Sequence, residues 1–331
     1  MYLTVEVYGS LRTGLLVPTS DIDCVMKIED KSKVAYILQR VAYCCGKYKG
    51  VQTARESKQA FAGGVRFIGN VLRGSGVFRQ VTCIAHAKVP IVKCVHRGDS
   101  IKVDLSFEED GCESSDFLCA QFQKEKFRLA RGLIILVKSL LANFSLDDPS
   151  VGGLGSFPTS ILVLYYLRAV VHEHYPVELR DNMAVIFVGF LKYYGNEQFD
   201  YRRECINFRE GKTFTKAPSS DLYIENPVKP GTNCSRSATL YASKVVPKFS
   251  EAAEDFSVLL EQDVKDRQVE SVLEEYFGRC IPQVSHWDQV ERRAENKPLV
   301  PQHQWDPKTN VYIGGVLDLT FYFYHVLYKS G

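Results

Sequence analysis

The chain has 331 residues, 45% of them hydrophobic, and its 41 lysines and arginines nearly balance 39 aspartates and glutamates. This length and apolar content predict two domains with buried cores and an appendage. The ten cysteines include no Cys-x-x-Cys pair, which favours reduced thiols in an intracellular protein over a disulfide scaffold or a zinc site. No signal peptide opens the chain and no apolar run reaches about 18 residues, so we expect a soluble protein without a membrane span.

The first predicted element is a strand over residues 3–7, in which apolar and polar side chains alternate. The chain then turns at Gly9-Ser10. Glycine lets a phosphate approach the backbone, and the Ser10 hydroxyl can reach a phosphate oxygen. On its own this pair is weak evidence for a phosphate site.

Two aspartates one residue apart, Asp21 and Asp23, begin the second predicted strand. Residues two apart in a strand point to the same face, so both carboxylates project together. The apolar side chains at the alternate positions of this strand pack on the other side. A later strand over residues 101–107 alternates in the same way and carries Asp104 on its polar face. We therefore expect Asp104 to join the pair across a sheet.

Three carboxylates on one sheet face repel each other and hold on to protons unless a cation balances them. Mg2+ prefers oxygen ligands and is commonly held by one or two carboxylates together with substrate phosphates. Two such ions about 3.5–4 Å apart can activate an attacking hydroxyl and stabilise the leaving oxygen of an in-line displacement. A lone Asp-x-Asp also occurs in calcium loops and acidic turns, but the ordered combination with the Gly-Ser turn favours a two-metal site.

The segment 47–97 holds ten lysines and arginines against one acid, Glu56. It predicts a salt-sensitive track for an RNA backbone, with Phe61, Phe67 and Phe78 as stacking platforms. The alternative is a solvated helix face with core aromatics. At its end, residues 89–95 and 101–107 are predicted to pair as a hairpin.

Long apolar-periodic stretches between residues 116 and 205, including 127–141 and 161–171, predict the helices of a central domain. The region 206–248, rich in Pro, Gly and Ser, is predicted as a loop region, and residues 245–276 return to helix. The tail from residue 281 is aromatic, and core packing is its default interpretation.

Taken together, the motifs resemble the nucleotidyltransferase superfamily typified by DNA polymerase beta. The resemblance rests on the run 7–23, the segments 89–93 and 103–107 around the third acid, the run 152–157 and the loop 222–237, which follow the family's order. Within the superfamily the chain is similar, over residues 5 to 262, to the noncanonical poly(A) polymerases of the Trf family, the catalytic subunits of nuclear TRAMP complexes.

This resemblance implies an α+β fold with a nucleotidyltransferase catalytic domain, a mainly helical central domain and the nucleotide site in the cleft between them. The implied domains are 1–110, 111–280 with the recognition loop 222–237, and an unassigned C-terminal extension, 281–331. The implied metal ligands and catalytic residues are Asp21, Asp23 and Asp104. The implied nucleotide-binding residues are Gly9, Ser10, Lys138 and Ser156 at the phosphates, Phe157 stacking on the base, and Asn233 and Arg236 choosing the base.

Some of these positions have a structural alternative. Lys138 lies in an apolar run and could extend from a buried helix, and Asn233 and Arg236 could be plain turn residues. The family often has acids in the recognition loop where this chain has Asn226 and Thr232-Asn233, which leaves the base preference open.

The resemblance implies template-independent addition of AMP from ATP to an RNA 3′ end with two Mg2+ or Mn2+ ions, in RNA processing and surveillance. It also implies a nuclear protein, with the cytoplasm as the alternative, and a separate RNA-binding partner of the zinc-knuckle type. A terminal RNA uridylyltransferase is the close alternative. An inactive RNA-binding scaffold is the alternative of a different class.

Overall fold

The computed structural model describes residues 3–28, 54–85, 90–98, 100–106, 110–195, 198–261, 268–278, 305–306 and 311–312. The chain divides into two compact units, which are described one at a time. Among the described residues, those within 3–14 and 20–116 and the short strands β9 (Trp305–Asp306) and β10 (Val311–Tyr312) belong to the first unit. Those within 15–19 and 117–278 belong to the second. The sequence-based domain limits stay predictions.

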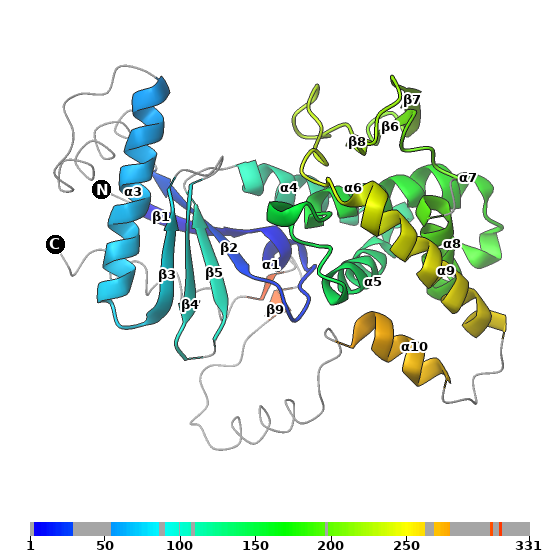
Figure 1. Cartoon of the computed structure of the whole chain (residues 1–331), viewed down its shortest axis with the longest axis horizontal. Helices are drawn as coiled ribbons and strands as arrows, with labels where there is room; N and C mark the ends of the chain where they lie inside the picture. The colour runs from blue at the N-terminus through cyan, green and yellow to red at the C-terminus, as the bar shows by residue number, and fades with distance from the viewer. Residues whose placement is uncertain are drawn as a thin grey trace. The chain divides into compact units, whose positions relative to one another are not determined.

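A five-stranded sheet forms the centre of the first unit, in the order β1-β2-β5-β4-β3 (Figure 1). Its strands are β1 (Leu3–Tyr8), β2 (Ile22–Ile28), β3 (Phe78–Ile84), β4 (Ile91–His96) and β5 (Lys102–Ser106). The β2 and β5 strands pair in parallel, whereas the other neighbours are antiparallel. The predicted first strand and the predicted hairpin are confirmed.

Helix α3 (Ala54–Gly74) packs along β3 and β4 of this sheet (Figure 1). Val65, Ile68 and Leu72 recur at helical spacing and are at most 4% exposed, as expected of one apolar stripe. They share a core with Val92 and Leu105 of the sheet. The alternating strand pattern and the helical pattern therefore meet in one hydrophobic layer.

The aromatic residues proposed as RNA stacking platforms are placed differently. Phe78 is 3% exposed and lies edge-on to His96, so the stacking role predicted for it is wrong: its ring belongs to the core. Phe67 is half-buried and packs on the same core, whereas the side chain of Phe61 lies outside the described residues. The cations Lys47, Lys49 and Lys88, and the side chains of Arg55 and Lys58, also lie outside them.

The second unit is mainly helical. Helix α4 (Asp110–Phe122) begins in the first unit, after which come η1 (Glu125–Phe127), α5 (Ala130–Asn143), η2 (Pro149–Val151), α6 (Ser156–Tyr166), η3 (Leu167–Val171), α7 (His172–His174), η4 (Val177–Leu179), α8 (Met183–Gly195), α9 (Val246–Glu261) and α10 (Gln268–Phe277). The predicted helices are confirmed for the described residues, but α5 begins three residues later than expected, and residues 262–267 of the last predicted helical region lie outside the described residues. Phe127 is 1% exposed within the preceding 3-10 turn, so it continues the apolar pattern without continuing the α-helix.

Tyrosine and phenylalanine rings fill the core between these helices. Tyr166 and Tyr194 are almost fully buried, and each satisfies its hydroxyl: Tyr166 with the hydroxyl of Tyr175 at 2.7 Å and Tyr194 with the carbonyl of Leu162 at 3.0 Å. A buried polar group without a partner destabilises a fold, so these bonds fix how the helices pack. In the described part of the chain, no helix is long and apolar enough to cross a bilayer.

The region predicted as loop contains a small sheet in the order β7-β6-β8. Its strands are β6 (Glu204–Asn207), β7 (Lys212–Thr215) and β8 (Tyr223–Ile224), and a π-helical turn, η5 (Tyr241–Val245), follows. The loop prediction was wrong for these strands, because strands of two to four residues contain too few alternating positions to stand out among turn-forming residues.

Candidate functional site

The two predicted catalytic strands lie side by side. The strands β2 and β5 are neighbours in the sheet (Figure 1). Asp23 of β2 is in parallel register with Asp104 of β5, and Asp21 immediately precedes β2. The side chain of Asp21 is 30% exposed and that of Asp104 is 15% exposed. The predicted meeting of Asp104 with the aspartate pair across the sheet is therefore confirmed.

A lysine that the sequence analysis assigned to the RNA track lies among these carboxylates. Lys93 of β4 is in register with Asp104, and its Nζ lies 2.6 Å from Oδ2 of Asp104 and 3.9 Å from Oδ2 of Asp21. The Nζ of Lys102 is 3.9 Å from Oδ1 of Asp21. Cations therefore offset part of the charge repulsion. The hairpin register contained the signal, because it sets Lys93 opposite Asp104.

Burial and charge both perturb the titration of this group of residues. Burial raises the pKa of Asp104 above its ordinary value, against the lowering effect of its hydrogen bond and charge interaction with Lys93. Burial, together with the charges of Asp23 and Asp104, raises the pKa of Tyr8 to about 12. The site thus combines partial desolvation with concentrated negative charge, which is typical of functional sites.

The Gly-Ser turn fits tightly against Asp23. Helix α1 (Gly9–Thr13) begins at Gly9, whose φ is +67°, a conformation that favours glycine. A Cβ at Gly9 would lie 2.1 Å from Oδ2 of Asp23, so any side chain there would displace the carboxylate. The hydroxyl of Thr13 donates to the Gly9 carbonyl at 2.9 Å and holds the turn.

Helix α4 holds the same turn from a distant part of the sequence. The Gly9 amide donates to Oγ of Ser115 at 2.8 Å, and that hydroxyl donates to the Gly111 carbonyl at 2.8 Å. A Cβ at Gly111 would lie 2.2 Å from the ring of Tyr8, so the helix approaches the end of β1 closely. The sequence did not predict this hydrogen bond of Ser115 to Gly9, because a small serine inside a helix does not indicate its distant partner.

The three aspartates supply oxygen donors of the kind that a divalent metal binds. Within the described residues, no cluster of three or more His, Cys, Asp or Glu side chains forms a ready metal site. Asp21, Asp23 and Asp104 nevertheless offer hard oxygen donors on neighbouring strands, and Mg2+ needs only one or two carboxylates when substrate phosphates complete its shell. The residues therefore fit a metal that binds together with a nucleoside triphosphate.

Three further predicted site residues lie on α5 and α6 of the second unit. Lys138 is 5% exposed, and its Nζ donates to the Leu15 carbonyl at 2.7 Å. Ser156 is exposed in the first turn of α6, where unpaired backbone amides favour an anion. Phe157 follows it, half-buried against the helical core. The geometry is compatible with phosphate contact at Ser156, and it gives Lys138 a structural partner as well.

The recognition loop uses most of its polar groups to hold its own shape. Asn233 Oδ1 accepts hydrogen bonds from the Ile224 amide at 3.1 Å and the Ser235 amide at 2.9 Å, and its Nδ2 donates to the Leu222 carbonyl at 3.0 Å. These bonds favour the structural interpretation of Asn233. Arg236, by contrast, is exposed.

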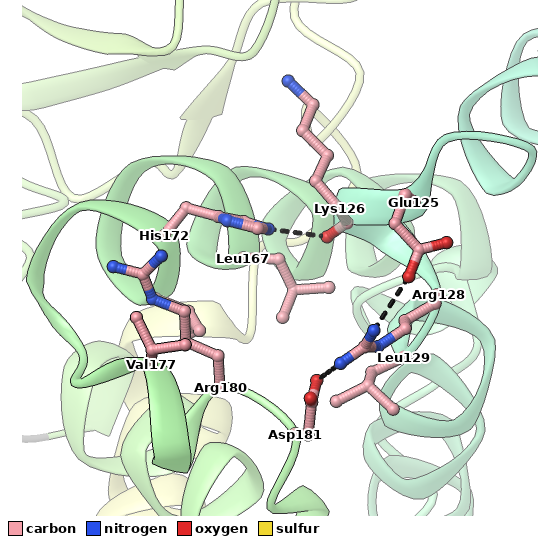
Figure 2. A pocket seen from close by; sticks show the side chains of 10 residues that line it. Glu125, Lys126, Arg128, Leu129, Leu167, His172, Val177, Arg180 and Asp181 are labelled. Atoms are coloured by element: carbon pink, nitrogen blue, oxygen red, sulfur yellow. Dashed lines mark hydrogen bonds and ion pairs between the residues drawn. The ribbon is translucent and has the colours of Figure 1, made fainter.

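A cavity of about 370 Å³ opens in the second unit (Figure 2). Its lining consists of Glu125, Lys126, Arg128, Leu129, Leu167, Val171, His172, Val177, Arg180 and Asp181. Arg128 bridges Glu125 and Asp181, and the His172 ring meets the Lys126 carbonyl at 3.0 Å. None of the predicted site residues lines this cavity, so it is separate from the predicted nucleotide site.

The two units, a mixed sheet that carries the paired aspartate strands and a mainly helical unit, agree with the predicted α+β fold. A family model described as "Poly(A) RNA polymerase, mitochondrial-like, central palm domain" matches residues 2–123, and one described as "Cid1 family poly A polymerase" matches residues 182–232. The predicted resemblance to noncanonical poly(A) polymerases is confirmed.

Named relatives agree with these family models. "Poly(A) RNA polymerase protein 1" of Eremothecium gossypii is 29% identical over 245 residues, which cover 69% of this chain and 34% of the relative. The chain thus spans about a third of the length of the curated relatives it matches first.

Solved structures share the fold. The polymerase core of TRAMP, an RNA surveillance complex, has a TM-score of 0.58 at 22% identity and covers 82% of this chain and 80% of its own. A cytoplasmic RNA terminal U-transferase has a TM-score of 0.55 at 19% identity, covering 82% of this chain and 85% of its own.

Proposed function

We propose that this chain adds AMP from ATP to RNA 3′ ends without a template. The observation that carries the proposal is the parallel register of β2 and β5, which sets Asp23 beside Asp104 with Asp21 immediately before β2. Carboxylates on adjacent strands are what an oxygen-loving metal and a triphosphate require. Relatives named as poly(A) RNA polymerases support the choice of reaction.

The proposed reaction is an in-line displacement at the α-phosphorus of ATP. The RNA 3′ oxygen forms a bond to this phosphorus, the bond to the β-phosphate oxygen breaks, and pyrophosphate leaves. Asp104 is one of the three carboxylates, and it would assist the 3′ hydroxyl as this group loses its proton to solvent. When bound, two Mg2+ or Mn2+ ions held by Asp21, Asp23 and Asp104 would stabilise the charge on the attacking and leaving oxygens.

The other predicted residues position the nucleotide. Gly9 and Ser10 would lie against the triphosphate. Lys138 would offset its charge, the Ser156 hydroxyl would bind the terminal phosphate, and Phe157 would stack on the base. Since Ser115 already accepts the Gly9 hydrogen bond, Gly9 would act through close backbone approach, and its amide would stay with Ser115. Catalysis would rest on positioning and charge stabilisation without a covalent enzyme intermediate.

Terminal uridylyl transfer is the second candidate function. The loop supports it, because Asn226 replaces an expected acid and its Oδ1 accepts from the Val228 amide at 2.9 Å, so it shapes the turn. Arg236 then remains the exposed polar group suited to contact a base edge, while Asn233 would fix the loop. The shared fold with a terminal U-transferase is compatible with this alternative.

The proposed setting follows from the relatives. The TRAMP polymerase core belongs to an RNA surveillance complex by its name, so we propose RNA processing in the nucleus, with the cytoplasm as the alternative. A separate RNA-binding partner of the zinc-knuckle type would supply affinity for the RNA strand.

The test incubates the purified chain with a labelled oligoadenylate, Mg2+ or Mn2+, and each nucleoside triphosphate separately. Wild type should extend the primer with ATP, whereas Asp21→Ala/Asp23→Ala and Asp104→Ala should not. Glu173→Ala is the matched control, because it removes an exposed carboxylate from α7 of the second unit.

The outcomes separate the candidate functions. Preference for UTP would move the enzyme to the uridylyl class. Extension by Asp104→Ala at the wild-type rate would refute the assigned chemistry. RNA binding by wild type without any extension would favour the inactive scaffold, which a repeat with added zinc-knuckle partner would test.

A further inference from the structure

The small sheet of the second unit presents an open face with two aromatic side chains. Cys205 of β6 is in register with Phe214 of β7 on one side and with Tyr223 of β8 on the other. Directly opposed residues point to the same face of a sheet, so these three side chains form a row across it. The next residues along, Ile206 and Ile224, are both 0% exposed, so the opposite face meets the core.

The row therefore faces away from the core. Phe214 is 41% exposed on an edge strand, and Cys205 and Tyr223 are half-buried. Neighbouring strands lie about 4.8 Å apart, so rings separated by one strand stand about 10 Å apart. Two rings at that separation would each stack on a different planar group.

A cation on this face is placed to contact a phosphate, and Glu225, an acid next to the row, is held by the Tyr223 hydroxyl and the Gly231 amide. Lys212 is exposed on the same face, two residues before Phe214. The outward positions of the three strands, which the register identifies as Cys205, Asn207, Lys212, Phe214 and Tyr223, include one cation and no acid. Glu204 belongs to the other face, where it accepts the Thr213 hydroxyl at 2.8 Å.

The row also adjoins the recognition loop. The Tyr223 hydroxyl donates to Oε2 of Glu225 at 3.3 Å, and Oε1 of Glu225 accepts the Gly231 amide at 2.6 Å. Glu225 in turn bridges to Asn233 as an isolated strand pair. These bonds hold one ring of the row rigidly against the loop that follows β8.

We propose that this open face, defined by Phe214, Cys205, Tyr223 and Lys212, binds single-stranded RNA. Bases stack on the two rings, and Lys212 contacts a phosphate. The inference deepens the proposed function, because it names a surface that holds the strand being extended. Exposed aromatic rings on a sheet with nearby cations are the usual means of holding single strands without sequence preference.

The test measures binding of a fluorescent oligoadenylate by anisotropy, with the Asp21→Ala/Asp23→Ala chain as the parent so that no extension occurs. Phe214→Ala and Tyr223→Leu should each weaken binding about 5- to 100-fold, whereas Phe214→Trp keeps a stacking ring and should bind like the parent. Lys212→Ala removes about one phosphate contact, so the slope of log affinity against log salt concentration should become less steep by about one.

Leu179→Ala is the matched control, since Leu179 is 39% exposed elsewhere in the same unit. Thermal unfolding shows that each variant is folded, and photocrosslinking of an iodouridine-containing RNA should map to Phe214 or Tyr223. RNA affinity unchanged in both ring variants, together with crosslinks elsewhere, would overturn the proposal and leave the face to a protein partner. Because the readout is binding, its failure is distinct from a failure to extend RNA.

Discussion

Replacing Ser115 with alanine tests whether α4 holds the phosphate turn in place. The Ser115 hydroxyl is 2% exposed and accepts the Gly9 amide at 2.8 Å while donating to Gly111 at 2.8 Å. Ser115→Ala leaves the Gly9 amide without its partner. An unsatisfied donor costs about 1–3 kcal/mol when fully buried, and Gly9 is half-buried, so we expect about 1–2 kcal/mol.

This cost should appear in catalysis more than in folding. The turn lies against Asp23, so a loosened Gly9 changes the position of the triphosphate relative to the carboxylates. A loss of 1–2 kcal/mol in transition-state stabilisation corresponds to about a 5- to 30-fold lower kcat/KM for ATP. Ser115→Cys preserves the size with a weaker acceptor and should fall between alanine and wild type.

The measurement is steady-state primer extension over a range of ATP concentrations, with thermal unfolding of the same samples. Ser114→Ala serves as the matched control, because it removes a hydroxyl from the adjacent position of the same helix. A Ser115→Ala enzyme with wild-type kcat/KM and wild-type unfolding temperature would refute the reasoning. An equal loss in Ser114→Ala would attribute the effect to the helix as a whole.

Three further predictions concern the same two sites. Gly9 has a positive φ, and an alanine Cβ there would lie 2.1 Å from Oδ2 of Asp23. Gly9→Ala should therefore cost about 3 kcal/mol or more and slow extension more than 100-fold. Activity within tenfold of wild type would contradict this. Because burial raises the folded-state pKa of Asp104, its stabilising contribution is present below the unfolded pKa of about 4 and is lost as pH rises through the folded value. Without metal, wild type should therefore lose stability relative to Asp104→Asn as the pH rises above about 4, and parallel melting curves would exclude this. Arg236→Ala should change the ATP-to-UTP ratio in extension assays, whereas Asn233→Ala should mainly lower the unfolding temperature by removing its loop bonds; the reverse pattern would exchange their roles.

The catalytic strands were predictable because the patterns that indicate them lie within short stretches of sequence. Alternation places Asp21 and Asp23 on one face within three residues, and the hairpin to Asp104 spans a short loop. The helices of the second unit were equally visible, since a run of buried residues repeats along each one. The small strands β6 to β8 were missed, because each is too short to display a period.

The sequence by itself determined which residue types gather at the site: the aspartates, the Gly-Ser turn and the hairpin are read from neighbours along the chain. The tertiary structure alone decided their partners. The hydrogen bond of Ser115 to Gly9 across 106 residues of sequence and the hydrogen bonds that Asn233 makes within its loop depend on contacts that no local period encodes. A hydrogen bond requires two groups within about 3 Å, and only the folded chain fixes which distant groups meet.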